Sequence, residues 1–540
     1  TSMKRLSTGD RITNAGDDAA GAAISDRMLS QVKGLDMSIR NAGDVISMAQ
    51  VSEGALGEIS DILQRVRELA IQSASDTYNA VERNYMQTET NQLLAEFDRV
   101  TKDTEFNEVN VLDGSFASKT FQIGVRKGEN ASISVSSMRI DAIGSYQQTS
   151  DMSTTDVDLA TGAKLQADAT TVGHVEADTV TINGQFGNKA LSVTANMSAK
   201  QVSDLVNQSF DEHGVDAVAS TQLKLEAVAN AVSGSAGVIT VAFDLYGKNS
   251  TKVKISAAIT TVTTRATSDV EPLRDAINAY TAQTGIEAVL SSDKSNLILT
   301  QSEGHDIRIG DIDFDLETSN DGTIASTTLA ANESDTNVLA VADASNIVAG
   351  DFVTGDLIPA GAYVTNVSGT NITISETIPS TVTAASGTAV KFVSAARSLA
   401  ITGLGEDQTT AGIGVTLLDK DQSTHNLDSA RVTGQITFNS TAQFTLQADT
   451  TKGLFSTSPG SATLKKLSEV KLNTRTAAVD ALVVLDKALD RINLERAKLG
   501  AIMSRMTLAI DNISNVSMNT KESRGRITDC LLYTSDAADE

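Results

Sequence analysis

The chain of 540 residues is long enough for about three to four domains. Its 43 Lys and Arg against 68 Asp and Glu give a formal net charge of −25, which repels phosphates and anionic headgroups and argues against nucleic acid or an acidic membrane as a partner. No stretch approaches the about 18 consecutive apolar residues of a membrane span, and the first residues lack the apolar run of a secretory signal. The single cysteine, Cys530, excludes an internal disulfide.

The N-terminal stretch predicts a long helix. Asp17 and Asp18 supply helix-start chemistry, and apolar residues then recur at alternating steps of four and three, which is typical of a coiled-coil seam. The register slips near Ser52 and Glu53, a discontinuity that changes supercoil winding. A second helix is predicted over residues 81–101 and a β-hairpin over residues 121–135. The predicted seam of the first helix consists of Leu35, Ile39, Ile46, Leu56, Ile59, Leu63 and Val66.

The C-terminal stretch carries the same alternation from about Thr474, without a slip and with only Arg496 polar. A seam without a partner would leave a long apolar stripe in water, so the two terminal helices are predicted to pack against each other in an antiparallel core. The predicted seam of this helix consists of Leu482, Leu485, Leu489, Ile492, Leu499, Met506, Ile510 and Ile513.

The middle of the chain is rich in Thr, Ser, Val and Gly with short alternating runs, which predicts a β-rich insert. It contains an internal repeat: a pattern of apolar residues, Asn and Gly recurs 71 residues later, as from Gly214 to Gly285, and each copy predicts a short helix, a glycine stop and a strand. The fold class is therefore α+β and multidomain. The expected domains are 1–144, 145–335 with repeats at about 178–245 and 249–316, 336–467, 468–529, and a tail at 530–540 that is foreign to the fold.

Candidate catalytic and metal-binding groups are few. No histidine is followed by the glutamate of a zinc-protease helix, and no phosphate-binding or nucleophile motif occurs. We therefore expect that the protein is not an enzyme and binds neither a cofactor nor a metal ion. Alternating carboxylates could hold calcium, but the apolar residues between them favour a half-buried strand with a solvated acidic face. These carboxylates are Asp311, Asp313, Asp315 and Glu317.

Both ends of the chain resemble one family. Residues 5–21 (RLSTGDRITNAGDDAAG) and 63–73 (LQRVRELAIQS) closely resemble the N-terminal core of bacterial flagellin. Residues 496–502 (RAKLGAI), 513–517 (ISNVS) and 523–527 (SRGRI) resemble its C-terminal core. The resemblance implies an extracellular structural protein, exported through the flagellar channel without a cleaved signal and polymerised into the filament for swimming. It also implies three partners: further copies of the chain, an export chaperone and cap proteins.

The sequence departs from the family pattern at both of its ends. The chain opens at Thr1, and the familiar C-terminal pattern stops at Asp529, so as given it is expected to fold as an elongated monomer rather than to form filaments.

Two alternatives to a filament subunit remain. One is a hook–filament junction protein, a group that usually carries a proline where this chain has Ala19. The other is a secreted β-rich adhesin, which would not need the helical seams.

The resemblance also implies a contact with the animal innate flagellin receptor. The matching positions are Arg65 and Leu69 on the first helix and Glu89 on the second. Arg65 and Leu69 are four residues apart and share a helix face, so we expect this patch to be exposed while Val66 packs in the seam.

Overall fold

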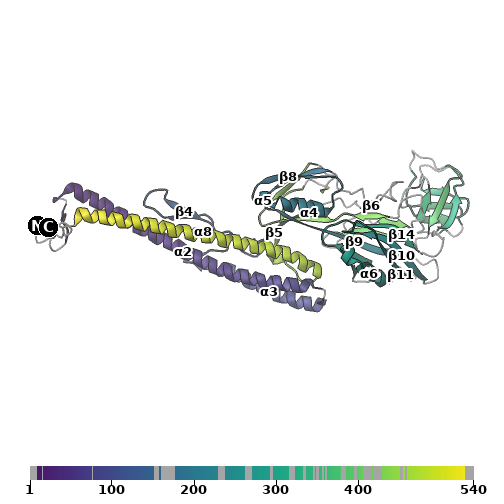
Figure 1. Cartoon of the computed structure of the whole chain (residues 1–540), viewed down its shortest axis with the longest axis horizontal. Coiled ribbons are helices and arrows are strands. Elements are labelled where there is room, and N and C mark those ends of the chain that lie inside the picture. The colour runs from purple at the N-terminus through teal and green to yellow at the C-terminus, as the bar shows by residue number, and fades with distance from the viewer. Residues whose placement is uncertain are drawn as a thin grey trace. The chain divides into compact units, whose positions relative to one another are not determined.

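The computed structural model shows a chain that divides into two compact units, one formed by Thr1–Ser145 with Leu464–Glu540 and the other by Tyr146–Thr463 (Figure 1). They are called the helical unit and the β-rich unit below. The structure describes residues 9–14, 16–75, 77–150, 157–159, 177–228, 237–261, 270–291, 296–314, 323–331, 336–344, 347, 352–355, 358, 362–378, 385–393, 398–404, 415–418, 429–449, 454–455 and 459–529. The expected tail at 530–540 lies outside them.

The helical unit contains three long helices: α2 (Ala19–Ala74), α3 (Ala80–Asp103) and α8 (Arg475–Thr528). The N-terminal α2 and the C-terminal α8 lie side by side along most of their lengths (Figure 1). They are antiparallel, because Asp36 near the start of α2 bonds to Ser517 near the end of α8, whereas Arg67 near the end of α2 pairs with Asp486 near the start of α8. This arrangement, with the β-rich middle, confirms the predicted α+β class.

Side chains cap each helix of this unit. The Asp18 carboxylate accepts from the Gly21 amide at 2.9 Å, and Asp17 accepts from the Thr13 amide at 3.1 Å, which confirms their helix-start chemistry. In α3 the Asn79 side chain accepts from the third helical amide while Glu82 returns a bond to the Asn79 amide, a capping box. These caps satisfy the amide groups that a helix start leaves without partners.

The segment between α3 and the β-rich unit packs on the helices. The strands β3 (Lys119–Gln122) and β4 (Asn130–Ile133) pair as the predicted hairpin. Ile133 and Met138 are fully buried in the same hydrophobic core as the helices. The shorter elements are β1 (Glu105–Phe106), β2 (Val109–Asn110) and the 3₁₀ turn η2 (Leu467–Glu469).

The β-rich unit contains the predicted repeat as two consecutive β-hairpin, helix and strand assemblies. The first is formed by β7 (Asp178–Asn183), β8 (Asn188–Val193), α4 (Ala199–Gln208), α5 (Phe210–His213) and β9 (Asp216–Val228). The second is formed by β10 (Gly237–Tyr246), β11 (Val253–Thr261), α6 (Glu271–Asn278), α7 (Thr281–Thr284) and β12 (Ile286–Leu290). The two assemblies are called repeat 1 and repeat 2.

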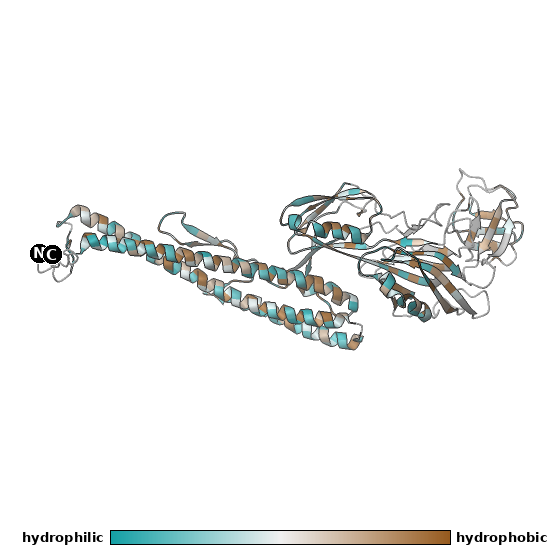
Figure 2. Ribbon diagram, in the orientation of Figure 1, coloured by the Kyte–Doolittle hydropathy of each residue, from teal (hydrophilic) through white to brown (hydrophobic). Residues whose placement is uncertain are grey.

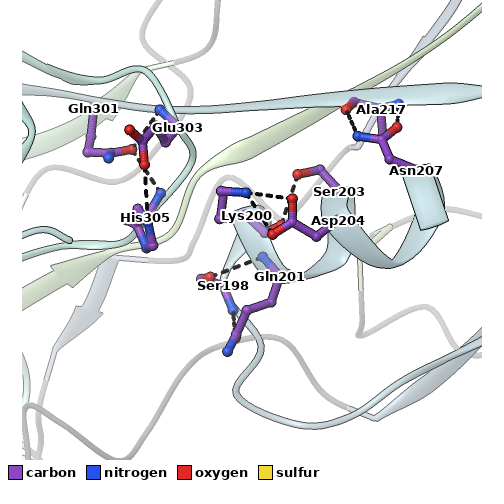
Figure 3. Close-up of polar contacts among 10 residues, drawn as sticks. All are labelled: Ser198, Lys200, Gln201, Ser203, Asp204, Asn207, Ala217, Gln301, Glu303 and His305. Carbon is purple, nitrogen blue, oxygen red and sulfur yellow. Dashed lines mark hydrogen bonds and ion pairs between the residues drawn. The ribbon is translucent and has the colours of Figure 1, made fainter.

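The same asparagine ties helix to strand in both repeats. In repeat 1 the Asn207 amide nitrogen donates to the Ala217 carbonyl at 2.9 Å and its oxygen accepts from the Ala217 amide at 2.8 Å (Figure 3). In repeat 2 Asn278 makes the same two bonds to Ala288, at 2.9 and 2.8 Å. Each asparagine side chain therefore pairs with the backbone of the following strand as another strand would.

A left-handed glycine turns the chain from helix to strand in both repeats. Gly214 has φ 72° and Gly285 has φ 70°, a conformation that favours glycine. Because the asparagine and the glycine are both required by the backbone path, the 71-residue spacing is visible in the sequence although other side chains differ.

The two repeats share β9. Its first half pairs with β24 (Gln435–Ser440), and its second half lies between β13 (Asn296–Gln301) and β21 (Ser398–Leu404). Ala217 and Ala219 face the core of repeat 1, while Leu223 and Leu225 face the core of repeat 2. The remaining strands of these sheets are β22 (Val415–Leu418), β25 (Thr445–Ala448), β6 (Val157–Leu159), β14 (Ile307–Phe314), β23 (Ala430–Val432), β5 (Gly144–Thr149) and β26 (Thr463–Lys466).

The acidic strand differs from its prediction. Asp311 is exposed, but Asp313 is buried, so the acidic face is not uniformly solvated. The register of β14 against β10 shifts at this point, and Asp311 has φ 52°, which marks a bulge that breaks the alternation of faces. Asp315 and Glu317 lie outside the described residues.

A small β unit has its own core, in which Phe392 is fully buried. Two three-stranded sheets form it, and its first strand begins at Thr323, so the expected boundary at 335/336 falls inside it. Its strands are β15 (Thr323–Thr328), β16 (Val338–Ala340), β17 (Phe352–Gly355), β18 (Val364–Ser368), β19 (Asn371–Ile374) and β20 (Ala389–Val393).

Candidate functional site

The surface of α2 that faces α8 follows the predicted seam only in part. The fully buried positions include Leu56, Ile59, Leu63 and Val66, and Leu35 is nearly so. Ile39 and Ile46 are only half-buried. Their neighbours Ser38 and Val45 lie at the centre of the contact instead.

The predicted slip near Ser52 is wrong. Ser52 is fully buried and its hydroxyl donates to the Met48 carbonyl at 3.0 Å, so the residue needs no outside partner. A line of buried positions runs without interruption at steps of three and four through Ser52. Because Ser52 is polar, a pattern of apolar residues alone leaves it out and suggests a slip. These positions are Ala42, Val45, Ala49, Ser52, Leu56, Ile59, Leu63, Val66, Ala70 and Ser73, and Met48, Ser60 and Leu69, each next to one of them, are also buried.

The surface of α8 that faces α2 is also displaced by one residue at several positions. Leu485, Ile492, Leu499 and Met506 are buried as predicted. Leu482, Leu489, Ile510 and Ile513 are half-buried at its edge. Three smaller or polar residues lie at the centre instead, and they are Ala481, Ala488 and Glu495.

Glu495 is a buried carboxylate that the seam prediction missed. Its Oε1 accepts from the Ser136 amide at 3.1 Å, and its Oε2 pairs with Lys498 at 3.0 Å. These contacts tie the segment that follows the hairpin to α8. Arg496, the polar residue that the sequence placed in the seam, lies at its edge and pairs with Glu53 of α2 at 3.1 Å.

Polar contacts between α2 and α8 set their register. Arg67 pairs with Asp486 at 2.6 Å, and the Asp36 carboxylate accepts from the Ser517 hydroxyl at 3.0 Å and pairs with Lys521 at 3.2 Å. The hydrogen bonds from Ser517 and Lys521 lower the pKa of Asp36. Exposed pairs of this kind contribute roughly 0–1 kcal/mol each, so the apolar seam supplies most of the stability and the pairs select the alignment.

The expected receptor patch is divided between surface and core. Arg65 lies between Glu89 of α3, at 2.9 Å, and Glu68, at 3.0 Å, and its side chain is 49% exposed. Leu69, in contrast, is only 2% exposed, which corrects its expected exposure. The reason is that α2 contacts α3 as well as α8, so a second line of its residues is covered.

The helical unit also exposes apolar side chains. Apolar residues recur on more than one face of the helices (Figure 2). On α8, Leu508 is 71% exposed, and on α3, Tyr85 is 70% exposed. At 100° per residue, four of the exposed apolar residues, Val479, Leu494, Leu508 and Val516, fall within an arc of about 100°, and Met518, which is 61% exposed, lies outside it. We call these four residues the outer stripe of α8.

The middle of the outer stripe, at Leu494 and Leu508, lies on the face of α8 opposite to the seam, and its end at Val516 adjoins the buried Ser517. Leu485 and Leu494 are nine residues apart, which is about half a turn around the helix. The stripe extends over most of α8, because Val479 and Val516 are separated by about 55 Å at 1.5 Å per residue. The sequence prediction named one seam and missed this second stripe, whose spacings of 15, 14 and 8 residues correspond to about 4.2, 3.9 and 2.2 turns.

Two further features of the described residues concern metal ions and membranes. No group of three or more His, Cys, Asp or Glu side chains among them is arranged to hold a metal ion. Within the same part of the chain, none of the helices is both long and apolar enough to cross a membrane. Of the four histidines, His213 and His305 are described, and both lie in the β-rich unit.

Family models match three parts of the chain. They describe the bacterial flagellin N-terminal helical region at residues 1–117, the bacterial flagellin C-terminal helical region at residues 482–537 and the flagellin hook IN motif at residues 240–303. The first two cover most of the helical unit, and the C-terminal match overlaps the tail at 530–540. The third covers most of repeat 2.

Relatives match over much longer stretches. Flagellin B of Vibrio cholerae is 36% identical over 59% of this chain and 85% of its own length. B-type flagellin of Pseudomonas aeruginosa is 28% identical over all of this chain and 88% of its own length. The solved structure of the flagellar junction protein FlgL from Legionella pneumophila is similar to 93% of this chain at 10% identity, with a TM-score of 0.31. The chain belongs to the bacterial flagellin family.

Proposed function

We propose that this flagellin is a structural subunit of the bacterial flagellar filament, that it functions outside the cell, and that its helical unit carries the contacts between subunits. The outer stripe of α8 supports this most directly. The seam on the opposite face already has its partner within the same chain, so the stripe remains available to a neighbour. A contact between two different faces of identical subunits builds a ring if its rotation closes and a helical fibre if it does not.

The β-rich unit then serves as the outer, surface-exposed part of the subunit. Its described residues form three hydrophobic cores of their own, which supports this role. An export chaperone, cap proteins and the animal flagellin receptor are the further partners that we propose from the family.

Polymerisation of the natural protein from purified monomer tests the role of the stripe. We expect Leu508→Glu to abolish or strongly slow filament growth, measured by light scattering and negative-stain microscopy, with an unchanged helical circular dichroism spectrum. Phe186→Glu is the matched control, because Phe186 is an exposed apolar residue of the β-rich unit. Normal filament growth by Leu508→Glu, or loss of filament growth in Phe186→Glu, would contradict the assignment of the stripe. Rings without filaments from the unmodified protein would favour a junction protein.

For the receptor we propose that Arg65 and Glu89 make the contact and that Leu69 contributes through its packing in the core beneath them. Both charged side chains are accessible and already held together at 2.9 Å, so little freedom is lost on binding. In a receptor reporter assay Arg65→Ala should reduce the potency of monomer without a change in stability. Leu69→Ala should lower the melting temperature as well, and unchanged potency in both folded variants would remove these residues from the contact.

A further inference from the structure

At one of the buried positions that differ between the two repeats, repeat 1 has a side chain that titrates and repeat 2 has one that does not. His213 of repeat 1 and Thr284 of repeat 2 are 71 residues apart, and each immediately precedes the left-handed glycine that turns the chain into a strand. Both side chains are fully buried. The difference matters because histidine titrates near neutral pH and threonine does not.

Each side chain accepts a hydrogen bond from the same backbone position. The Val215 amide donates to His213 Nδ1 at 3.1 Å, and the Ile286 amide donates to Thr284 Oγ1 at 3.2 Å. An Nδ1 atom that accepts a bond carries no proton, so the ring proton lies on Nε2, 3.0 Å from the Ser209 hydroxyl oxygen. The neutral imidazole therefore satisfies both of its neighbours.

The turn at His213 joins three parts of repeat 1. The Gly214 amide donates to the Phe210 carbonyl at 2.7 Å, which closes α5. The Ser440 hydroxyl of β24 donates to the Gly214 carbonyl at 2.8 Å. The β7–β8 turn packs against the same place, because Gly184 lies so close to the His213 carbonyl that a Cβ would clash with it. A change in this turn therefore affects the hairpin, the helix and the central strands together.

We propose that His213 is an acid-sensitive latch of repeat 1. A proton added at Nδ1 converts the acceptor into a donor that faces the Val215 amide, so two donors oppose each other and a positive charge is buried. The turn then opens, together with the β7–β8 hairpin that rests on it. The Thr284 hydroxyl does not gain a proton in this range, so the matching turn of repeat 2 stays closed.

The surrounding charges favour the protonated ring less than burial opposes it. Glu212 and Lys189 act on it with opposite sign and pair with each other at 2.9 Å. Asp211 and Asp216 are the other charged residues within three positions along the chain, and β24 presents only neutral Asn439 and Ser440 near the turn. Burial is the main cause that lowers the pKa of His213 below the usual 6.5.

The direction of the pH effect follows from this lowering. The unfolded or opened histidine binds a proton more readily than the closed one, so stability of the turn is intact above about pH 6.5 and decreases as the pH falls toward the lower pKa of the closed state. One proton changes the opening equilibrium by at most about tenfold per pH unit.

Hydrogen–deuterium exchange on the full chain measures this opening. Between pH 7.5 and 5.5, after correction for intrinsic rates, we expect exchange in residues 183–188 and 209–217 to rise severalfold, with about tenfold as the limit. The matching residues 280–288 of repeat 2 should not change. In His213→Thr, which copies repeat 2, the rise should disappear. Equal rises in both repeats, or a rise that persists in His213→Thr, would overturn the proposal.

A second measurement does not depend on that variant. Nuclear magnetic resonance of histidine-labelled wild-type protein, assigned by single replacement of the other three histidines, should show His213 protonated on Nε2 and titrating below pH 6.5. Protonation on Nδ1, or titration at or above pH 6.5, would overturn the latch.

Discussion

Leu485→Ala tests the seam that joins the two ends of the chain. Leu485 is fully buried on the face of α8 that contacts α2. Its replacement removes apolar atoms from the core and leaves a cavity between two helices that are also held by polar contacts along their length. Because those contacts limit the collapse of the helices into the space, we expect a substantial cost.

The magnitude follows from comparable substitutions. A buried Leu→Ala change costs about 2.7–5 kcal/mol, and we take about 3 kcal/mol for this site. For a cooperative unit of about 150–250 residues, each kcal/mol lowers the melting temperature by about 2–4 °C, so the expected decrease is about 6–12 °C.

Thermal unfolding followed by far-ultraviolet circular dichroism is the measurement, because α2, α3 and α8 dominate the helical signal. Leu508→Ala is the matched control: it makes the same change on the same helix at a side chain that is 71% exposed. The control should shift the melting temperature by less than about 2 °C. Equal shifts in both variants, or a larger shift in Leu508→Ala, would refute the assignment of the two faces of α8.

Three further predictions concern polar contacts. Glu495→Ala should lower stability by about 2–3 kcal/mol in denaturant unfolding, whereas Glu522→Ala, which removes one member of an exposed ion pair on the same helix, should cost less than about 1 kcal/mol; equal costs would argue against a buried role for the carboxylate. Asn278→Ala should speed hydrogen–deuterium exchange of the Ala288 amide. An unchanged exchange rate would show that the two hydrogen bonds from Asn278 are dispensable. Because the pKa of Asp36 lies below its usual 3.8 in the folded chain, its contribution is present at neutral pH and is lost as the pH falls below 3.8 toward that lower pKa, so Asp36→Asn should flatten the stability profile in this acidic range.

The sequence predicted the helical seam to within one residue, and the error has a physical cause. Leucine periodicity places Leu489 in the seam, but the smaller Ala488 lies at the centre of the contact and Leu489 covers its edge. Close approach of two helices selects small residues at the centre, and apolarity alone does not distinguish the centre from the edge. Lys498 shows a related limit, because it looks like an isolated exposed residue although it pairs with buried Glu495.

The repeats were visible in the sequence because backbone geometry requires particular residue types. An asparagine side chain that pairs with a strand and a glycine at positive φ have few substitutes, so their spacing persists. The bulge at Asp311 and the burial of Leu69 had no such signal. The first depends on the register against a strand far away in the sequence, and the second on the presence of α3 beside α2.

The two faces of α8 explain how one helix can serve both folding and assembly. One helix can carry a buried seam on one face and an exposed apolar stripe on another, and each face then contacts a different partner. Seam changes such as Leu485→Ala should therefore weaken the monomer and, through it, the filament, whereas Leu508→Glu should weaken the filament alone. Measurement of melting temperature and filament growth on both variants separates the two roles, and loss of monomer stability in Leu508→Glu would show that the stripe belongs to the fold of the single chain.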